Sequence, residues 1–200
     1  MGGNRRVILG AILFGLALAT QKGTPVAEAA KKILPKAEID GLAAALRQDP
    51  GRFFAQPVSF TWWLRGGEPG SGSDSLKFSS DGSGIHAIYI RARFNADYRP
   101  PMLSEQFAGD LNVKQATGIL GPVLDSPLFR EELPQEQKPR IADLQKETWE
   151  FARGAVALQK TLHEPFPDQL ASGRAACREA MEYLTKTGQR TIRQPKPPSH

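Results

Sequence analysis

The chain has 200 residues, of which 40% are hydrophobic, enough for one core of ordinary size and hardly for two. Its single cysteine, Cys177, excludes an intramolecular disulfide, and the apolar residues near it favour a buried side chain over a reactive thiol. The net charge of +5 is compatible with an anionic partner but does not require one.

Residues 1–22 have the pattern of an export signal. Arg5 and Arg6 precede an uncharged run from Val7 to Ala19, which ends in a small-x-small sequence typical of signal-peptide cleavage. As a helix this run would be about 20 Å long, short of the ~30 Å membrane core, so cleavage is favoured. Two alternatives stay open: an uncleaved anchor that contacts the membrane through residues 7–19, and a twin-arginine type of signal.

Two short helices are expected next. Thr24-Pro25 is typical of a helix start, and this helix would run to Pro35. A second helix is predicted from Ala37 to Arg47, ending before Asp49-Pro50-Gly51. Residues 20–188 are interpreted as one domain.

Residues 57–95 change from a helical period to a period of two. Strands are predicted at Val58–Arg65, Leu76–Ser79 and Ile85–Phe94. They predict a three-stranded antiparallel sheet with one apolar face and one wet face. In the third strand, Ile88 and Ile90 are assigned to the apolar face.

The rest of the chain is predicted to be helical. Short helices are expected within residues 105–132, the first one capped by Ser104. Apolar residues at 3-4 spacing over 141–162 predict an amphipathic helix, and a second helix is expected at 168–186. Together they predict an αα-hairpin over residues 138–187 that packs on the sheet, and hence an α+β fold. Residues 189–200 are predicted to be a disordered, basic, Pro-rich tail.

The wet face of the sheet is the best candidate site. It is expected to carry a set of aromatic and basic binding residues: Trp63, Arg65, Tyr89, Arg91 and Arg93. Arginine forks beside aromatic rings suit carboxylates, phosphates or sugar rings. The structural alternative is that these arginines pair with acids on neighbouring elements. The sequence contains no catalytic or nucleotide motif, and no metal or cofactor is expected.

Two hypotheses of function follow. The first is a non-enzymatic accessory or assembly subunit of the cell envelope, periplasmic or membrane-anchored, which binds a protein partner through the sheet face or the amphipathic helix. The second is a periplasmic ligand-binding module or hydrolase in which Arg91 or Arg93 holds an anionic substrate. Nucleic acid is not expected as a partner because an exported protein seldom meets it.

Overall fold

The structure is a computed structural model that describes residues 36–66, 72–93, 103–129, 145–154 and 156–193. All of them belong to one compact unit, Ile33–His200. The expected export signal, and the helix expected from Pro25 to Pro35, lie outside the described residues. Among the described residues, no helix has the length and apolar character needed to cross a membrane.

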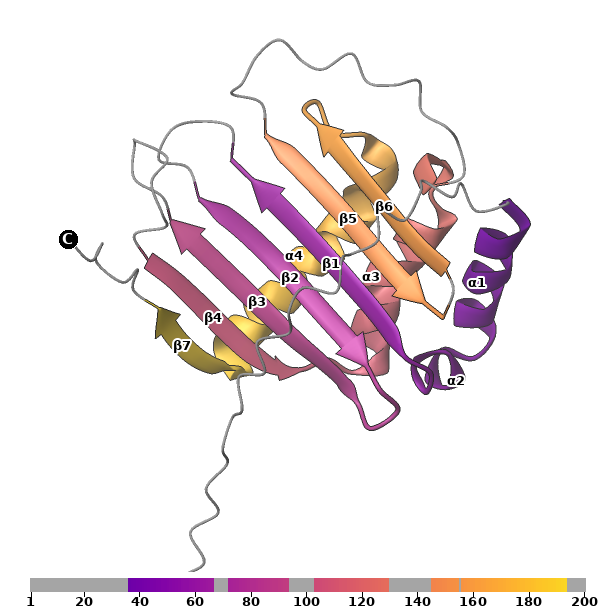
Figure 1. Cartoon of the computed structure of the whole chain (residues 1–200), viewed down its shortest axis with the longest axis horizontal. Coiled ribbons are helices and arrows are strands. Elements are labelled where there is room, and N and C mark those ends of the chain that lie inside the picture. The colour runs from indigo at the N-terminus through magenta and orange to yellow at the C-terminus, as the bar shows by residue number, and fades with distance from the viewer. Residues whose placement is uncertain (1–35, 67–71, 94–102, 130–144, 155, 194–200) are drawn as a thin grey trace, which may run out of the picture. The chain divides into compact units, whose positions relative to one another are not determined.

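A seven-stranded antiparallel sheet is the centre of the fold (Figure 1). Its strands follow the order β6-β5-β1-β2-β3-β4-β7. In chain order they are β1 (Val58–Arg65), β2 (Ser73–Ser80), β3 (Ile85–Arg93), β4 (Leu103–Asp110), β5 (Lys146–Arg153), β6 (Val156–His163) and β7 (Gln189–Arg193). The meander β1 to β4 is therefore extended on one side by the β5–β6 hairpin and on the other by β7.

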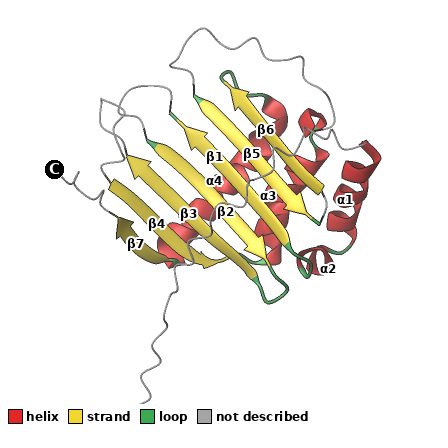
Figure 2. Cartoon of the chain, in the orientation of Figure 1, coloured by secondary structure: helices red, strands yellow, loops and turns green. Residues whose placement is uncertain are grey.

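The described helices are α1 (Lys36–Gln48), α2 (Pro50–Phe54), α3 (Val113–Asp125) and α4 (Ala171–Thr187), with short 3₁₀ turns η1 (Pro127–Phe129) and η2 (Asp168–Leu170). Helices α3 and α4 lie behind the sheet in Figure 2, and no described helix covers the face toward the viewer. Side-chain caps begin two of the helices. Asp49 accepts a hydrogen bond from the backbone of Arg52, and Asn112 forms a capping box with Gln115.

The core lies between the sheet and α3 and α4. Trp62 of β1 and Trp149 of β5 are directly opposite each other and fully buried, with ring centroids 6.1 Å apart. Phe60 stacks on Phe78 of β2 at 4.9 Å. Helix α4 approaches β5 closely at Gly173, where a Cβ atom would lie 3.3 Å from the Trp149 ring. A side chain at this position would require the Trp149 ring or α4 to shift by a few tenths of an ångström.

The α+β class is correct, but the expected architecture is wrong. Instead of a three-stranded sheet against an αα-hairpin at 138–187, the sheet has seven strands, and residues 146–163 form the β5–β6 hairpin. The turn contains Gly154 at φ +60°, a conformation that L-residues seldom adopt and that ends any helix. Only the second half of the expected helical hairpin exists, as α4.

Other expectations also changed. Residues 103–110 form β4, where a helix starting at Glu105 was expected, and α3 begins only after Asn112. Residues 189–193, assigned to a disordered tail, pair with β4 as β7, and residues 194–200 lie outside the described residues. A short helix that was not predicted, α2, starts at Pro50 after the N-cap Asp49. The helix expected at 37–47 and the strand at 58–65 are confirmed.

Candidate functional site

The five predicted binding residues do not share one face of the sheet. Residues directly opposite in neighbouring strands point to the same face. Trp63 lies opposite Ser75, which lies opposite Ile90, whereas Tyr89 lies in the adjacent row with Leu76. The assignment of faces in β3 was therefore wrong. Trp63 and Arg65 point away from the helices, and Tyr89, Arg91 and Arg93 fall by register on the helix side.

Burial confirms this register. Tyr89 is 2% exposed and Ile88 is 36% exposed, the reverse of the expectation for β3. Tyr89 donates a hydrogen bond to Asp74 Oδ1 at 2.7 Å and accepts one from Arg91 Nε at 2.8 Å. Burial, followed by the bond to Asp74, raises the pKa of Tyr89 to about 12. Tyr89 is thus a structural side chain that links β2 and β3.

Arg91 is held by acids of the neighbouring strands. Its guanidinium lies 3.9 Å from Asp74 and 3.9 Å from Glu105 of β4, which also pairs with Arg190 of β7. Arg93 is exposed and its side chain lies against Gly72, where a Cβ atom would clash with it. The ion pairs of Arg91 match the structural alternative.

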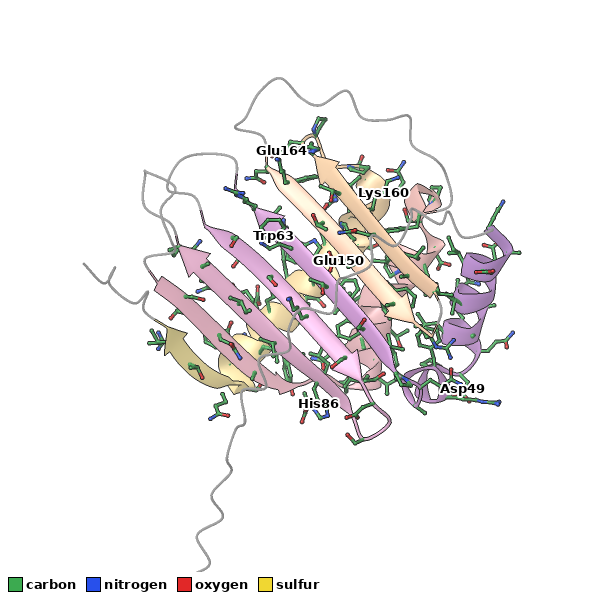
Figure 3. The ribbon with its side chains drawn as sticks, in the orientation of Figure 1. Asp49, Trp63, His86, Glu150, Lys160 and Glu164 are labelled. Carbon is green, nitrogen blue, oxygen red and sulfur yellow. The ribbon has the colours of Figure 1, made fainter. Side chains whose placement is uncertain are left out.

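The face opposite the helices is called the open face below. It comprises the outward side chains of the strands, with Trp63 on β1 and Glu150 on β5 labelled in Figure 3. Arg65 lies directly opposite Lys146 of β5, and both side chains are exposed. Like charges directly opposite each other destabilise a sheet. Within the described part of the chain, neither cation has a hydrogen bond or ion pair, which leaves both available for an anionic group.

The rest of the open face is mixed in character. Lys77 and Ile88 are exposed next to each other in register, and Ile90 is half-buried. Two acids on this face already have partners: Glu150 accepts a hydrogen bond from Gln159 at 3.0 Å, and Asp110 contacts His86 at 2.7 Å. Because the Gln159 amide is neutral, Glu150 keeps its negative charge, and the face carries charges of both signs with the cation pair Arg65 and Lys146 at one end.

Lys146 is a binding candidate that the sequence did not reveal, because residues 138–162 were interpreted as a helix. The alternation of Glu147, Trp149 and Phe151 with Thr148 and Glu150 is a signal that could have identified the strand.

A cavity of about 580 Å³ lies on the helix side, at the end of the sheet where β1 ends and β5 begins. It is lined by Leu64, Gln145, Glu164, Pro165, Phe166, Arg174 and Arg178. None of these residues was among the predicted binding residues.

Beside the cavity, Glu147 is fully buried and both of its oxygens accept hydrogen bonds. The donors are Trp62 Nε1 at 2.7 Å and Arg174 Nη1 at 3.2 Å. Arg174 also donates to the Pro167 carbonyl at 2.9 Å and lies over the ring of Phe166. The Arg174 guanidinium is therefore fixed from three sides.

A serine, a histidine and an aspartate meet at the β2–β3 turn, at the other end of the strands. His86 Nδ1 lies 2.7 Å from Asp110, and Ser83 Oγ lies 3.4 Å from His86 Nε2. The Ser83 hydroxyl, however, donates to Asp81 at 2.6 Å, an interaction that lowers the pKa of Asp81. Because the side chains of His86, Asp81 and Asp110 are more than half exposed, water surrounds the group and nothing positions a substrate. The geometry is that of a polar turn.

Among the described residues, no group of three or more His, Cys, Asp or Glu side chains is arranged to hold a metal ion. No model of a protein family matches the chain, and no curated protein is significantly similar to it. The two candidate sites, the open face around Arg65 and the helix-side cavity, therefore stand on their own geometry.

Proposed function

We propose that this chain is a non-enzymatic binding subunit of the cell envelope, whose open face docks on an acidic surface of a protein partner. The observation that carries the proposal is the like-charge pair Arg65 and Lys146 beside Trp63, on a sheet face that no described helix covers. Trp and Arg are enriched among the residues that dominate binding energy in protein interfaces.

The dimensions of the open face suit a protein partner. Seven strands span about 29 Å across the sheet and eight residues about 27 Å along a strand, or roughly 800 Å². This is about the area that one partner contributes to a standard interface. The face is built on a rigid sheet, so little conformational entropy is lost on docking.

The single change Arg65→Glu tests the docking surface. It replaces a like-charge cross-strand pair by an opposite-charge pair with Lys146, so we expect stability to rise by about 0.2–1 kcal/mol. Partner capture should be lost, because the new carboxylate repels an acidic surface. A variant that is more stable yet no longer binds cannot be explained by misfolding.

Capture is measured by photo-crosslinking in cells, with p-benzoyl-phenylalanine in place of Thr61 on the open face. Glu182 on the exposed side of α4 is the matched control position. The proposal requires a discrete crosslinked protein from position 61 that is absent from position 182 and absent in Arg65→Glu. Equal crosslinking from both positions, or a product unaffected by Arg65→Glu, would overturn it.

The proposal includes export through residues 1–19, which rests on the basic start, the apolar run and the small-x-small ending of that segment. Cell fractionation with intact-mass measurement tests it. An envelope species that lacks residues 1–19 supports a cleaved signal, and a full-length membrane species supports an anchor. A full-length species in the cytoplasm would remove the envelope from the proposal and leave the docking surface to be judged by crosslinking.

A further inference from the structure

The helix-side cavity has a charge arrangement that the proposed docking function does not use. Arg174 and Arg178 lie four residues apart on α4 and so share one face of the helix, and both line the cavity. The charge of Arg174 is compensated by the buried carboxylate of Glu147. Arg178 is exposed and has no hydrogen bond or ion pair among the described residues, so it is the uncompensated cation of the cavity.

The same cavity holds one carboxylate. Glu164 follows β6 at the end of the sheet, as labelled in Figure 3, and its side chain is exposed. One of its oxygens accepts a long hydrogen bond of 3.4 Å from the backbone of Gln145, which leaves the other oxygen available. The cavity thus offers one cation and one anion to a ligand. The net charge of Arg174, Arg178, Glu164 and the adjacent Glu147 is zero.

The remaining wall is apolar. Leu64 of β1, Pro165 and Phe166 line the cavity between the charged groups, and Phe166 is itself held under the guanidinium of Arg174. A cavity of about 580 Å³ is within the usual range for small-molecule sites, and such sites combine apolar walls with few polar groups.

We propose that this cavity binds a free α-amino acid with an apolar side chain. Its carboxylate pairs with Arg178 beside the fixed Arg174, its ammonium pairs with Glu164, and its side chain lies against Phe166 and Leu64. A dianion such as phosphate fits less well, because Glu164 repels it and only one guanidinium is uncompensated.

The buried pair Glu147 and Arg174 acts as a positioning element in this site. Taking two charges out of water is costly, and such a pair is seldom a source of stability relative to apolar residues. Here it holds a guanidinium rigidly at the wall of a cavity. Arg178 supplies the adaptable contact, and Arg174 limits how the carboxylate can turn.

Calorimetry with four probes tests the charge arrangement: L-phenylalanine, L-leucine, phenylacetate without an ammonium, and phenethylamine without a carboxylate. The two amino acids should bind, and each single-charge probe should bind at least tenfold more weakly than L-phenylalanine. Arg178→Met and Glu164→Gln should each lower the affinity for L-phenylalanine by about tenfold to a hundredfold, the value of a charge-assisted hydrogen bond. Lys186→Met, an exposed cation two turns further along α4, should leave it unchanged.

Adjacent tryptophans on opposite faces locate the bound probe. The Trp62 indole contacts Glu147 beside the cavity, whereas Trp63 lies on the open face. L-phenylalanine should shift the indole NMR signal of Trp62 and leave that of Trp63 in place.

The proposal is overturned if no amino acid binds at millimolar concentration, if phenylacetate binds as well as L-phenylalanine, or if Lys186→Met weakens binding as much as Arg178→Met. It is independent of the docking surface, because Arg178→Met should not change the crosslink from position 61.

Discussion

Replacing Arg174 should destabilise the protein more than replacing its partner Glu147. In Arg174→Met, the Glu147 carboxylate stays fully buried and keeps only the hydrogen bond from Trp62. An uncompensated buried charge costs about 3–5 kcal/mol. In Glu147→Gln, the remaining charge is the Arg174 guanidinium, whose side chain is 12% exposed and borders the cavity, so water can solvate it in part. We expect about 1–3 kcal/mol for this variant.

The experiment is a double-mutant cycle by urea unfolding, followed by circular dichroism. The double variant should be less destabilised than the sum of the single variants, with a coupling of about 1–3 kcal/mol. A loss of 3 kcal/mol corresponds to roughly 6–12 °C in Tm for a protein of this size. Arg178→Met is the control, with an expected change within about 0.5 kcal/mol. Coupling below 0.5 kcal/mol, or equal losses in Arg174→Met and Arg178→Met, would refute the argument.

Three further predictions follow from single side chains. The pKa of Tyr89 is raised to about 12 in the folded protein, from about 10 in the unfolded chain. The contribution of Tyr89 to the free energy of unfolding is therefore fully present below pH 10. It is lost as the pH rises from 10 to 12, by about 2–3 kcal/mol in total. Denaturant midpoints of Tyr89→Phe should lack this loss, and parallel curves for the two proteins would contradict it. Burial, and secondarily the charge of Glu147, raise the pKa of the Cys177 thiol. A thiol reagent should therefore label Cys177 in the native protein only at the rate of unfolding, and fast labelling would place Cys177 at the surface. Gly154→Ala should cost about 1–2 kcal/mol because φ is +60° there and the Cβ meets no other atom; a neutral result in thermal unfolding would exclude this strain.

The β5–β6 hairpin shows why the sequence was misinterpreted there. A spacing of four residues, as between Leu158 and Leu162, satisfies both a helix and a strand, because four is even and also close to one helical turn. The residue between them decides, and here it is Lys160, which lies opposite Trp149 on the core face. A charged residue at a core position removes the strand alternation from β6. Gly154 was the remaining signal for a hairpin, because glycine destabilises the interior of a helix and favours a tight turn.

Strand β3 shows a different limit of prediction from the sequence. Its two alternating sets are both plausible as the buried face, since one contains Ile88 and Ile90 and the other Ile85 and Tyr89. Arg91 belongs to the buried set and lowers the mean hydropathy of that set. A comparison of the two sets by hydropathy therefore favours the wrong one. That arginine is accommodated because Asp74 and Glu105 lie opposite it on both neighbouring strands. Only the register between strands carries this information, and the register is not contained in the period of one strand.

The two candidate sites follow from the alternation of a single strand. The end of β1 contributes Leu64 to the helix-side cavity and Arg65 to the open face, and one step earlier Trp62 and Trp63 divide in the same way. Consecutive residues therefore belong to surfaces of different chemistry, separated by the thickness of the sheet. A one-residue shift of β1 would exchange them, placing Arg65 against the core and Trp62 in water, so the core packing of Trp62 on Trp149 is also what defines both sites.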